Sequence, residues 1–156
     1  MALALARRVA EAVGVALFAG LFGAFLLQVF MRYVMNRPLG WTDELSLLLY
    51  PWAVFWTCAF ILKDGEHVRF DVLTAAAGRR ARRLFAAIGG LATLGLFAAA
   101  LPDTLDWVRF MARERTPVLD WRYHYIFAVF PLFMAAVAGR AAWALWRLAR
   151  GAEPPA

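Results

Sequence analysis

The sequence of 156 residues has one cysteine, Cys58, and almost no charge within its long apolar runs. A single cysteine excludes an internal disulfide framework and any metal site built from several cysteines. The abundance of apolar residues excludes a disordered chain, because disordered segments contain too few of them to form a core. The sequence also lacks a Gly-rich phosphate loop, a serine nucleophile elbow and an HExxH zinc motif, which removes the common signatures of nucleotide binding and hydrolysis.

Apolar residues make up 63% of the chain without counting glycine. Soluble domains reach roughly 45–50% even when glycine is included. The mean hydropathy of +0.61 agrees with this excess. A chain this short buries only a limited share of its surface, so it cannot hide so much apolar area from water. The composition therefore predicts an integral membrane protein.

Four apolar stretches are long enough to cross a hydrocarbon core of roughly 30 Å as helices. The first is too long for the apolar region of a signal peptide, so we expect it to be retained as a span. In the fourth, Pro131 interrupts the pattern, and the helix is expected to continue beyond it. We expect an all-α fold in one transmembrane domain, residues 1–156, with spans at 9–31, 45–62, 84–101 and 123–148.

Basic residues are distributed unevenly among the loops. Eleven of the 17 lie in the two tails and the second loop, and six lie in the first and third loops. Because cytoplasmic loops carry the excess of Lys and Arg, this bias predicts that both termini are cytoplasmic. The net charge of +6 is spread over the span ends and forms no single basic face, so the expected partners are membrane lipids and not nucleic acid.

The second and third loops contain apolar residues at helical spacing. Each fits either a lengthened span or a short helix lying in the membrane interface. In the second loop these residues are Phe70, Leu73 and Ala77, and in the third they are Leu105, Val108, Met111 and Ala112.

The middles of all four spans lack Asp, Glu, Lys, Arg and His. Enzymes and ion-coupled carriers that act within a membrane need ionisable groups at depth. We therefore expect neither an enzyme nor a protein that moves a charged solute by itself. A self-sufficient exporter would need a membrane-buried carboxylate, for which Glu11 is the one candidate.

Small residues recur on two spans at helical spacing. Such residues let a second helix approach closely, and a polar residue adds a hydrogen bond across the contact. The second helix is either another span of this chain or a helix of a different protein, and the spacing does not separate the two. The candidate packing residues are Ala16, Gly20, Ala24 and Gln28 in the first span, and Gly89, Gly90 and Thr93 in the third.

Thr42, Asp43 and Glu44 directly precede the second span. Thr42 suits the N-cap position, and the helix dipole favours carboxylates in a first turn by about 0.3–1 kcal/mol. Capping explains these residues, and pairing with a basic partner at the membrane surface is the alternative. Within the span, Pro51 removes the hydrogen bond to the Leu47 carbonyl and is expected to kink the helix.

Two histidines raise the alternative of a respiratory membrane anchor that binds haem or quinone. With the topology above, His67 is cytoplasmic and His124 lies at the outer end of the fourth span, so the hydrocarbon thickness of roughly 30 Å separates them. One haem cannot bridge that distance. We therefore expect no cofactor and no metal.

The segment GWTDELSLLLYPWAVFWTCAFILKDGEHVRFDVL, residues 40–73, contains two marks that are one membrane crossing apart. Trp41 and Glu44 open the second span. A Gly-Glu-His-hydrophobic-x-hydrophobic-Asp run follows its end. The two marks together resemble the small membrane subunit (DctQ-like) of TRAP transporters, the tripartite ATP-independent periplasmic carriers. The run supplies Gly65, Glu66, His67 and Asp71 as family-motif residues.

The resemblance implies one subunit of a secondary active transporter. In such systems a periplasmic binding protein delivers a carboxylate-type solute, and a large membrane subunit takes it up together with sodium. The small subunit is implied to be a scaffold for the large one in the bacterial inner membrane, so both other components are expected partners. For Glu66 and Asp71 the alternative is a solvated loop whose pairs with nearby arginines contribute about 0–1 kcal/mol.

Overall fold

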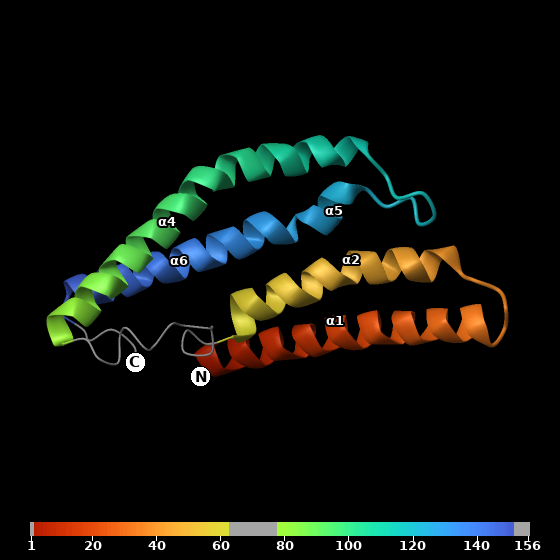
Figure 1. Cartoon of the computed structure of the whole chain (residues 1–156), viewed down its shortest axis with the longest axis horizontal. Coiled ribbons are helices and arrows are strands. Elements are labelled where there is room, and N and C mark those ends of the chain that lie inside the picture. Colours follow the sequence, from red (N-terminus) through yellow and green to blue (C-terminus); the bar gives the residue numbers. More distant parts are fainter. Residues whose placement is uncertain (1, 63–77, 152–156) are drawn as a thin grey trace. The chain divides into compact units, whose positions relative to one another are not determined.

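In the computed structural model of this chain, which describes residues 2–62 and 78–151, most of the described residues are helical (Figure 1). Four segments are long and apolar enough to cross a membrane, and this confirms the predicted all-α fold with four transmembrane helices. The elements are α1 (Ala2–Tyr33), α2 (Gly40–Trp56), the π-helical turn η1 (Thr57–Ile61), α4 (Arg79–Phe110), the 3-10 turn η2 (Met111–Arg113), α5 (Tyr123–Phe127) and α6 (Val129–Ala149).

The third span is longer than its uncharged core. Leu105 and Val108 lie within α4, which continues past Pro102 to Phe110 and ends in η2. The alternative of a lengthened span is therefore correct for the third loop, and the separate interfacial helix is wrong. Proline removes a single hydrogen bond, and the flanking turns keep the helix continuous. The corresponding residues of the second loop, around Phe70, lie outside the described residues.

The fourth span is divided at Ala128, between α5 and α6. Pro131 has no N–H to donate to the carbonyl of Phe127, the last residue of α5, so the helical ladder is broken there. The Ala128 N–H still donates to the His124 carbonyl (2.9 Å), and the Leu132 N–H donates to the Ala128 carbonyl (3.4 Å). The helix then continues to Ala149, as expected.

The contacts between Cα atoms divide the chain into two compact units. Unit 1 comprises Met1–Ile61 and Thr104–Phe133, and unit 2 comprises Leu62–Asp103 and Met134–Ala156. The two boundaries within helices fall one residue after Pro102 and two residues after Pro131. The single domain inferred from the sequence stays a prediction.

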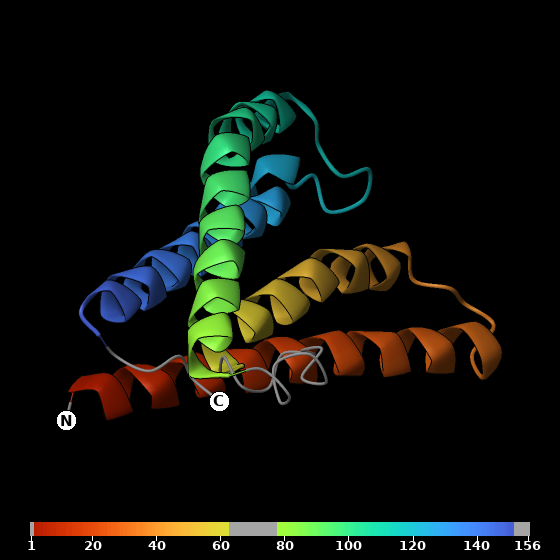
Figure 2. The ribbon, with the colours of Figure 1, turned by 60° about the vertical axis from the view of Figure 1, so that its left-hand side comes forward.

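In unit 1, α1 and α2 lie side by side and run in opposite directions (Figures 1 and 2). At one end Trp56 donates its indole N–H to the Ala10 carbonyl (3.0 Å), and at the other Arg32 meets Asp43 (3.0 Å). The spacing of three and four residues along α1 is the spacing at which the side chains of two helices interlock. The buried and half-buried positions of α1 that follow this spacing are Ala10, Gly14, Leu17, Leu21, Ala24, Gln28 and Met31.

The four-residue stripe proposed for α1 coincides only partly with these positions. Ala24 and Gln28 are 7% and 5% exposed, whereas Ala16 is exposed. A Cβ atom added to Gly20 would lie 3.4 Å from Leu49 Cδ1. Each four-residue step overshoots a helical turn by about 40°, so a strict stripe rotates away from one neighbouring helix.

In unit 2, α4 and α6 are in contact. The Arg83 guanidinium donates to the Leu148 carbonyl (3.3 Å). A Cβ atom added to Gly90 would lie 2.9 Å from Leu145 Cδ2, whereas one added to Gly89 would have no heavy atom within 4 Å. Thr93 is half-buried. Two adjacent glycines of α4 therefore have different surroundings, and only Gly90 requires its small size for packing within unit 2.

We expect Gly90→Leu to lower the free energy of unfolding by about 1–3 kcal/mol, because the added side chain overpacks the contact with Leu145. Thermal unfolding of the purified protein in detergent, followed by circular dichroism, measures this change. Gly89→Leu is the matched control, with the same substitution one residue away and no change expected. Equal midpoints for the two variants would contradict the packing.

Candidate functional site

The polar contacts of unit 1 gather where two chain connections meet. We call residues 34–44 together with 113–125 the loop end of unit 1. It contains the connection from α1 to α2, the start of α2, and the connection from η2 to α5. Two of the family-motif residues, Trp41 and Glu44, lie here, so the loop end is the candidate site.

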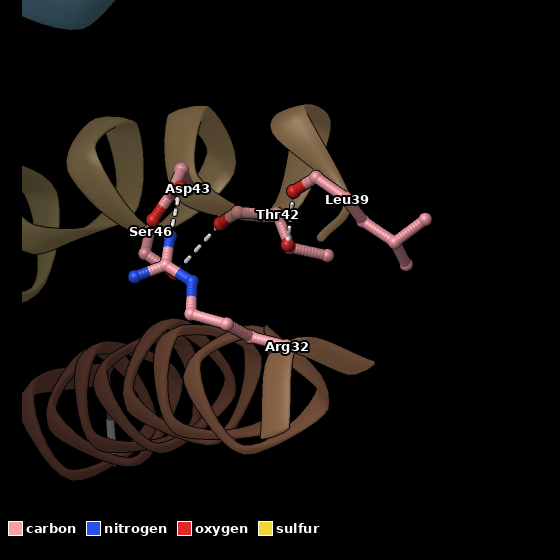
Figure 3. A network of polar contacts seen from close by, with 5 residues as sticks. All are labelled: Arg32, Leu39, Thr42, Asp43 and Ser46. Atoms are coloured by element: carbon pink, nitrogen blue, oxygen red, sulfur yellow. Dashed lines mark hydrogen bonds and ion pairs between the residues drawn. The ribbon is translucent and has the colours of Figure 1, made fainter. Parts of the chain in front are cut away.

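The start of α2 differs from the expectation for Thr42. Helix α2 begins at Gly40, and its N-cap is Leu39, whose extended backbone provides no side-chain cap. Thr42 is fully buried inside the first turn and donates its hydroxyl to the Leu39 carbonyl (2.7 Å). Ser46 in turn donates to the Thr42 carbonyl (2.9 Å), as Figure 3 shows. The N-cap assignment of Thr42 was therefore wrong, because Gly40 and Trp41 already belong to the helix.

An ion pair joins the ends of α1 and α2 across their connection. Arg32 and Asp43 lie 3.0 Å apart, as Figure 3 shows, with side chains 47% and 61% exposed. At that exposure water screens the pair, which contributes about 0–1 kcal/mol. Asp43 also lies in the first turn of α2, where the helix dipole favours a carboxylate.

Glu44 faces the connection between η2 and α5. Its carboxylate accepts hydrogen bonds from two consecutive backbone amides, those of Leu119 (2.6 Å) and Val118 (3.4 Å). These residues are 75 and 74 positions away in the sequence. Hydrogen bonds to a charged acceptor are stronger than neutral ones, so Glu44 holds this loop against the start of α2.

The loop held by Glu44 is a closed hairpin. Thr116 and Trp121 are joined twice: the Thr116 N–H donates to the Trp121 carbonyl (2.8 Å), and the Trp121 N–H donates to the Thr116 hydroxyl (3.0 Å). Asp120 completes the turn with φ of +52°, a left-handed conformation that Asp tolerates better than most residues. The Arg115 guanidinium forms an ion pair with the Asp120 carboxylate. A single antiparallel bridge pairs Arg115 with Arg122 at the base.

Aromatic side chains connect the hairpin to the spans of unit 1. The Trp52 indole N–H donates to the Tyr125 carbonyl (3.2 Å), which ties α2 to α5. Deeper in the unit, the Phe55 ring centroid lies 4.6 Å from that of Phe130 and 5.1 Å from that of Phe133. These contacts hold the start of the fourth span against α2, so the loop end has a fixed base.

Of the other candidate residues, Glu11 lies outside the loop end, whereas His124 lies within it on α5. Glu11 forms an exposed ion pair with Arg7 (2.8 Å), one helical turn away on α1. The Nδ1 atom of His124 is buried and has no hydrogen-bond partner among the described residues. No group of three metal-ligating side chains occurs within residues 2–62 and 78–151.

Comparison with known proteins decides the family. The family model for the DctQ component of tripartite ATP-independent periplasmic transporters matches residues 21–151, which include the whole loop end. The chain belongs to the DctQ family. Members of this family are transporter components, so the chain is not an enzyme. Its four spans make it a multi-pass membrane protein.

Two curated relatives illustrate the DctQ similarity. The C4-dicarboxylate TRAP transporter small permease protein DctQ of Pseudomonas aeruginosa is 30% identical over 124 residues, which cover 76% of this chain and 59% of that protein. The sialic acid TRAP transporter permease protein SiaT of Haemophilus influenzae is 32% identical over 73 residues, which cover 47% of this chain and 12% of that protein. The chain thus spans less than two thirds of either relative.

The described part of the DctQ motif has a structural explanation. Trp41 is 38% exposed beside the connection, and Glu44 binds the hairpin. The other four motif residues, Gly65, Glu66, His67 and Asp71, lie outside the described residues. Sequence reasoning missed Thr116 and Asp120. The signal available for them was the Thr-Pro start and the Asp end of a short segment, which are typical turn residues.

We expect Glu44→Ala to release the hairpin, because the Val118 and Leu119 amides lose their acceptor. Glu44 is partly exposed, so the loss is about 1 kcal/mol, and amide hydrogen exchange at Leu119 should become about fivefold faster. Hydrogen–deuterium exchange with mass spectrometry on the full chain in detergent measures this rate.

Asp43→Ala is the control for this measurement. It removes the neighbouring carboxylate and the pair with Arg32 but leaves both hairpin bonds in place. The exchange rate at Leu119 should then stay at its original value. Equal acceleration by the two variants would show that Glu44 does not hold the hairpin.

Proposed function

We propose that this chain is the small permease subunit of a TRAP transporter and that it scaffolds a separate, larger membrane permease. The observation that carries the proposal is the family match over residues 21–151. The similarity to SiaT supports it further, since the matching segment is only 12% of that permease protein. The name of that relative, a sialic acid TRAP transporter permease protein, is consistent with a role beside a larger permease.

The surface of the spans supports a scaffold role. In each membrane-crossing helix, at most 22% of the most apolar 18-residue stretch is buried within the chain. In α4, none of this stretch is buried. The helices therefore present most of their apolar surface to their surroundings. Small residues on such a surface allow close approach of a partner helix. We propose the face of α4 that carries Gly89 as one contact with the large subunit.

The proposed solutes are carboxylates delivered by a periplasmic binding protein, and the proposed location is the bacterial inner membrane. The names of both relatives support the solute class, since one refers to C4-dicarboxylates and the other to sialic acid. The family resemblance supports sodium-coupled uptake by the large subunit. Solute recognition belongs to the other components, consistent with the uncharged middles of the spans.

Purification of a tagged copy from its native cells in a mild detergent tests the scaffold role. We expect a larger polytopic permease to copurify in stoichiometric amount. Gly89→Leu should lower its recovery several-fold without changing the stability of the isolated chain, because the added side chain blocks helix approach. Gly95→Leu, on a different face of α4 with no heavy atom within 4 Å of its added Cβ, is the control.

Two results would contradict this proposal. One is recovery of the wild-type chain alone under conditions that keep other membrane complexes intact. The other is solute uptake into vesicles that contain this chain as their only protein, because a scaffold does not transport by itself.

The charge bias supports an orientation with both termini in the cytoplasm. With Cys58→Ala as background, Arg37→Cys should react with a membrane-impermeant maleimide in intact spheroplasts. Gly78→Cys should react only after the membrane is permeabilised, because it precedes α4 on the opposite side of the spans. The reverse labelling pattern would require the opposite orientation.

A further inference from the structure

Arg122 lies opposite a second positively charged side chain. In the bridge at the base of the hairpin it is paired with Arg115, and like charges directly opposite each other destabilise a strand pair. The Arg115 guanidinium is compensated by Asp120. Within the part of the chain that the structure describes, no carboxylate forms an ion pair with Arg122. This residue therefore offers a cation that the described residues leave uncompensated.

A surface cleft of about 460 Å³ opens beside these residues. It has two guanidinium groups and one carboxylate, so its formal charge is positive. Trp121 and Tyr125 contribute exposed aromatic surface, with 51% and 62% of their area accessible. The cleft is lined by Arg115, Asp120, Trp121, Arg122 and Tyr125.

The position of the cleft beside the fourth span indicates which part of the membrane is near it. The segment Tyr123–Ala149, long and apolar enough to cross a membrane, begins directly after Arg122, so the cleft lies next to the end of a span. Trp and Tyr side chains are enriched at this depth, where one part of the ring contacts acyl chains and the other contacts headgroups. A soluble protein would approach from the aqueous side, whereas this cleft also has an apolar border.

We propose that this cleft binds the phosphate of a phospholipid headgroup, with Arg122 as its principal ligand. The planar guanidinium presents parallel N–H donors that match two phosphate oxygens. The aromatic rings of Trp121 and Tyr125 contact the glycerol and upper acyl region. This site is independent of the proposed transporter role, since it concerns how the loop end is seated in its leaflet.

Native mass spectrometry of the full-length protein in detergent tests the site. The probes are phosphatidylglycerol and monogalactosyl diacylglycerol, which has acyl chains but no phosphate. We expect tighter binding of phosphatidylglycerol, and Arg122→Gln should weaken that binding about tenfold, or about 1.4 kcal/mol. Arg37→Gln removes an exposed charge from the same loop end and should leave it unchanged.

Several outcomes would overturn the proposal. They are an equal affinity for both lipids, an unchanged affinity in Arg122→Gln, and an equal loss in Arg37→Gln. Displacement of the lipid by an equal concentration of inorganic phosphate would assign the cleft to a free anion. Binding of a soluble acidic protein that depends on Arg122, with lipid binding unaffected, would assign it to a protein partner.

If circular dichroism shows that Arg122→Gln does not fold, a second variant tests the same role. Arg122→Lys keeps the charge but loses the two parallel donors. We expect it to retain the preference for phosphatidylglycerol over the galactolipid with a several-fold lower affinity. Wild-type affinity in Arg122→Lys would overturn the role of the guanidinium.

Discussion

Hydrogen bonding of the backbone within hydrocarbon is the constraint on which the rest of this structure depends. A lipid-exposed N–H or C=O group finds no water there, so each span must satisfy its groups within its own helix. Prolines are tolerated where the loss is local: α4 continues through Pro102, whereas the ladder of the fourth span breaks before Pro131. The second span ends in the π-helical turn η1, and residues 34–39 and 114–122 form non-helical connections.

At the loop end, the N–H and C=O groups of irregular backbone also need hydrogen-bond partners. The hairpin pairs Thr116 with Trp121 internally, and the amides left over at its tip bind the carboxylate of Glu44. One acidic side chain at the start of α2 therefore satisfies two donors and also fixes the position of the fourth span relative to the second within unit 1. A DctQ protein that acts as a scaffold needs this kind of rigidity more than it needs reactive groups.

The number and type of the spans could be predicted from the sequence, because the length of an apolar run is a direct measure of membrane crossing. The ends of the helices were harder to predict from the sequence. Helix α2 starts at Gly40 and α4 continues past Pro102, and the hydropathy pattern marks neither position. Glu44 was found through its place at the start of the second span and through the family resemblance. Its partner Leu119 was not, because hydrophobic periodicity reports neighbours within one element and not a hydrogen bond between distant segments.

The bond between Glu44 and Leu119 has a consequence for how the protein is made. The two residues are separated by 75 positions, and ribosomes add about 5–20 residues per second, so Glu44 emerges roughly 4–15 s before its partner. During that interval the Glu44 carboxylate has no hairpin amides to bind. The bond between Glu44 and the hairpin is therefore a late step of biogenesis, since it can form only after Leu119 has been synthesised.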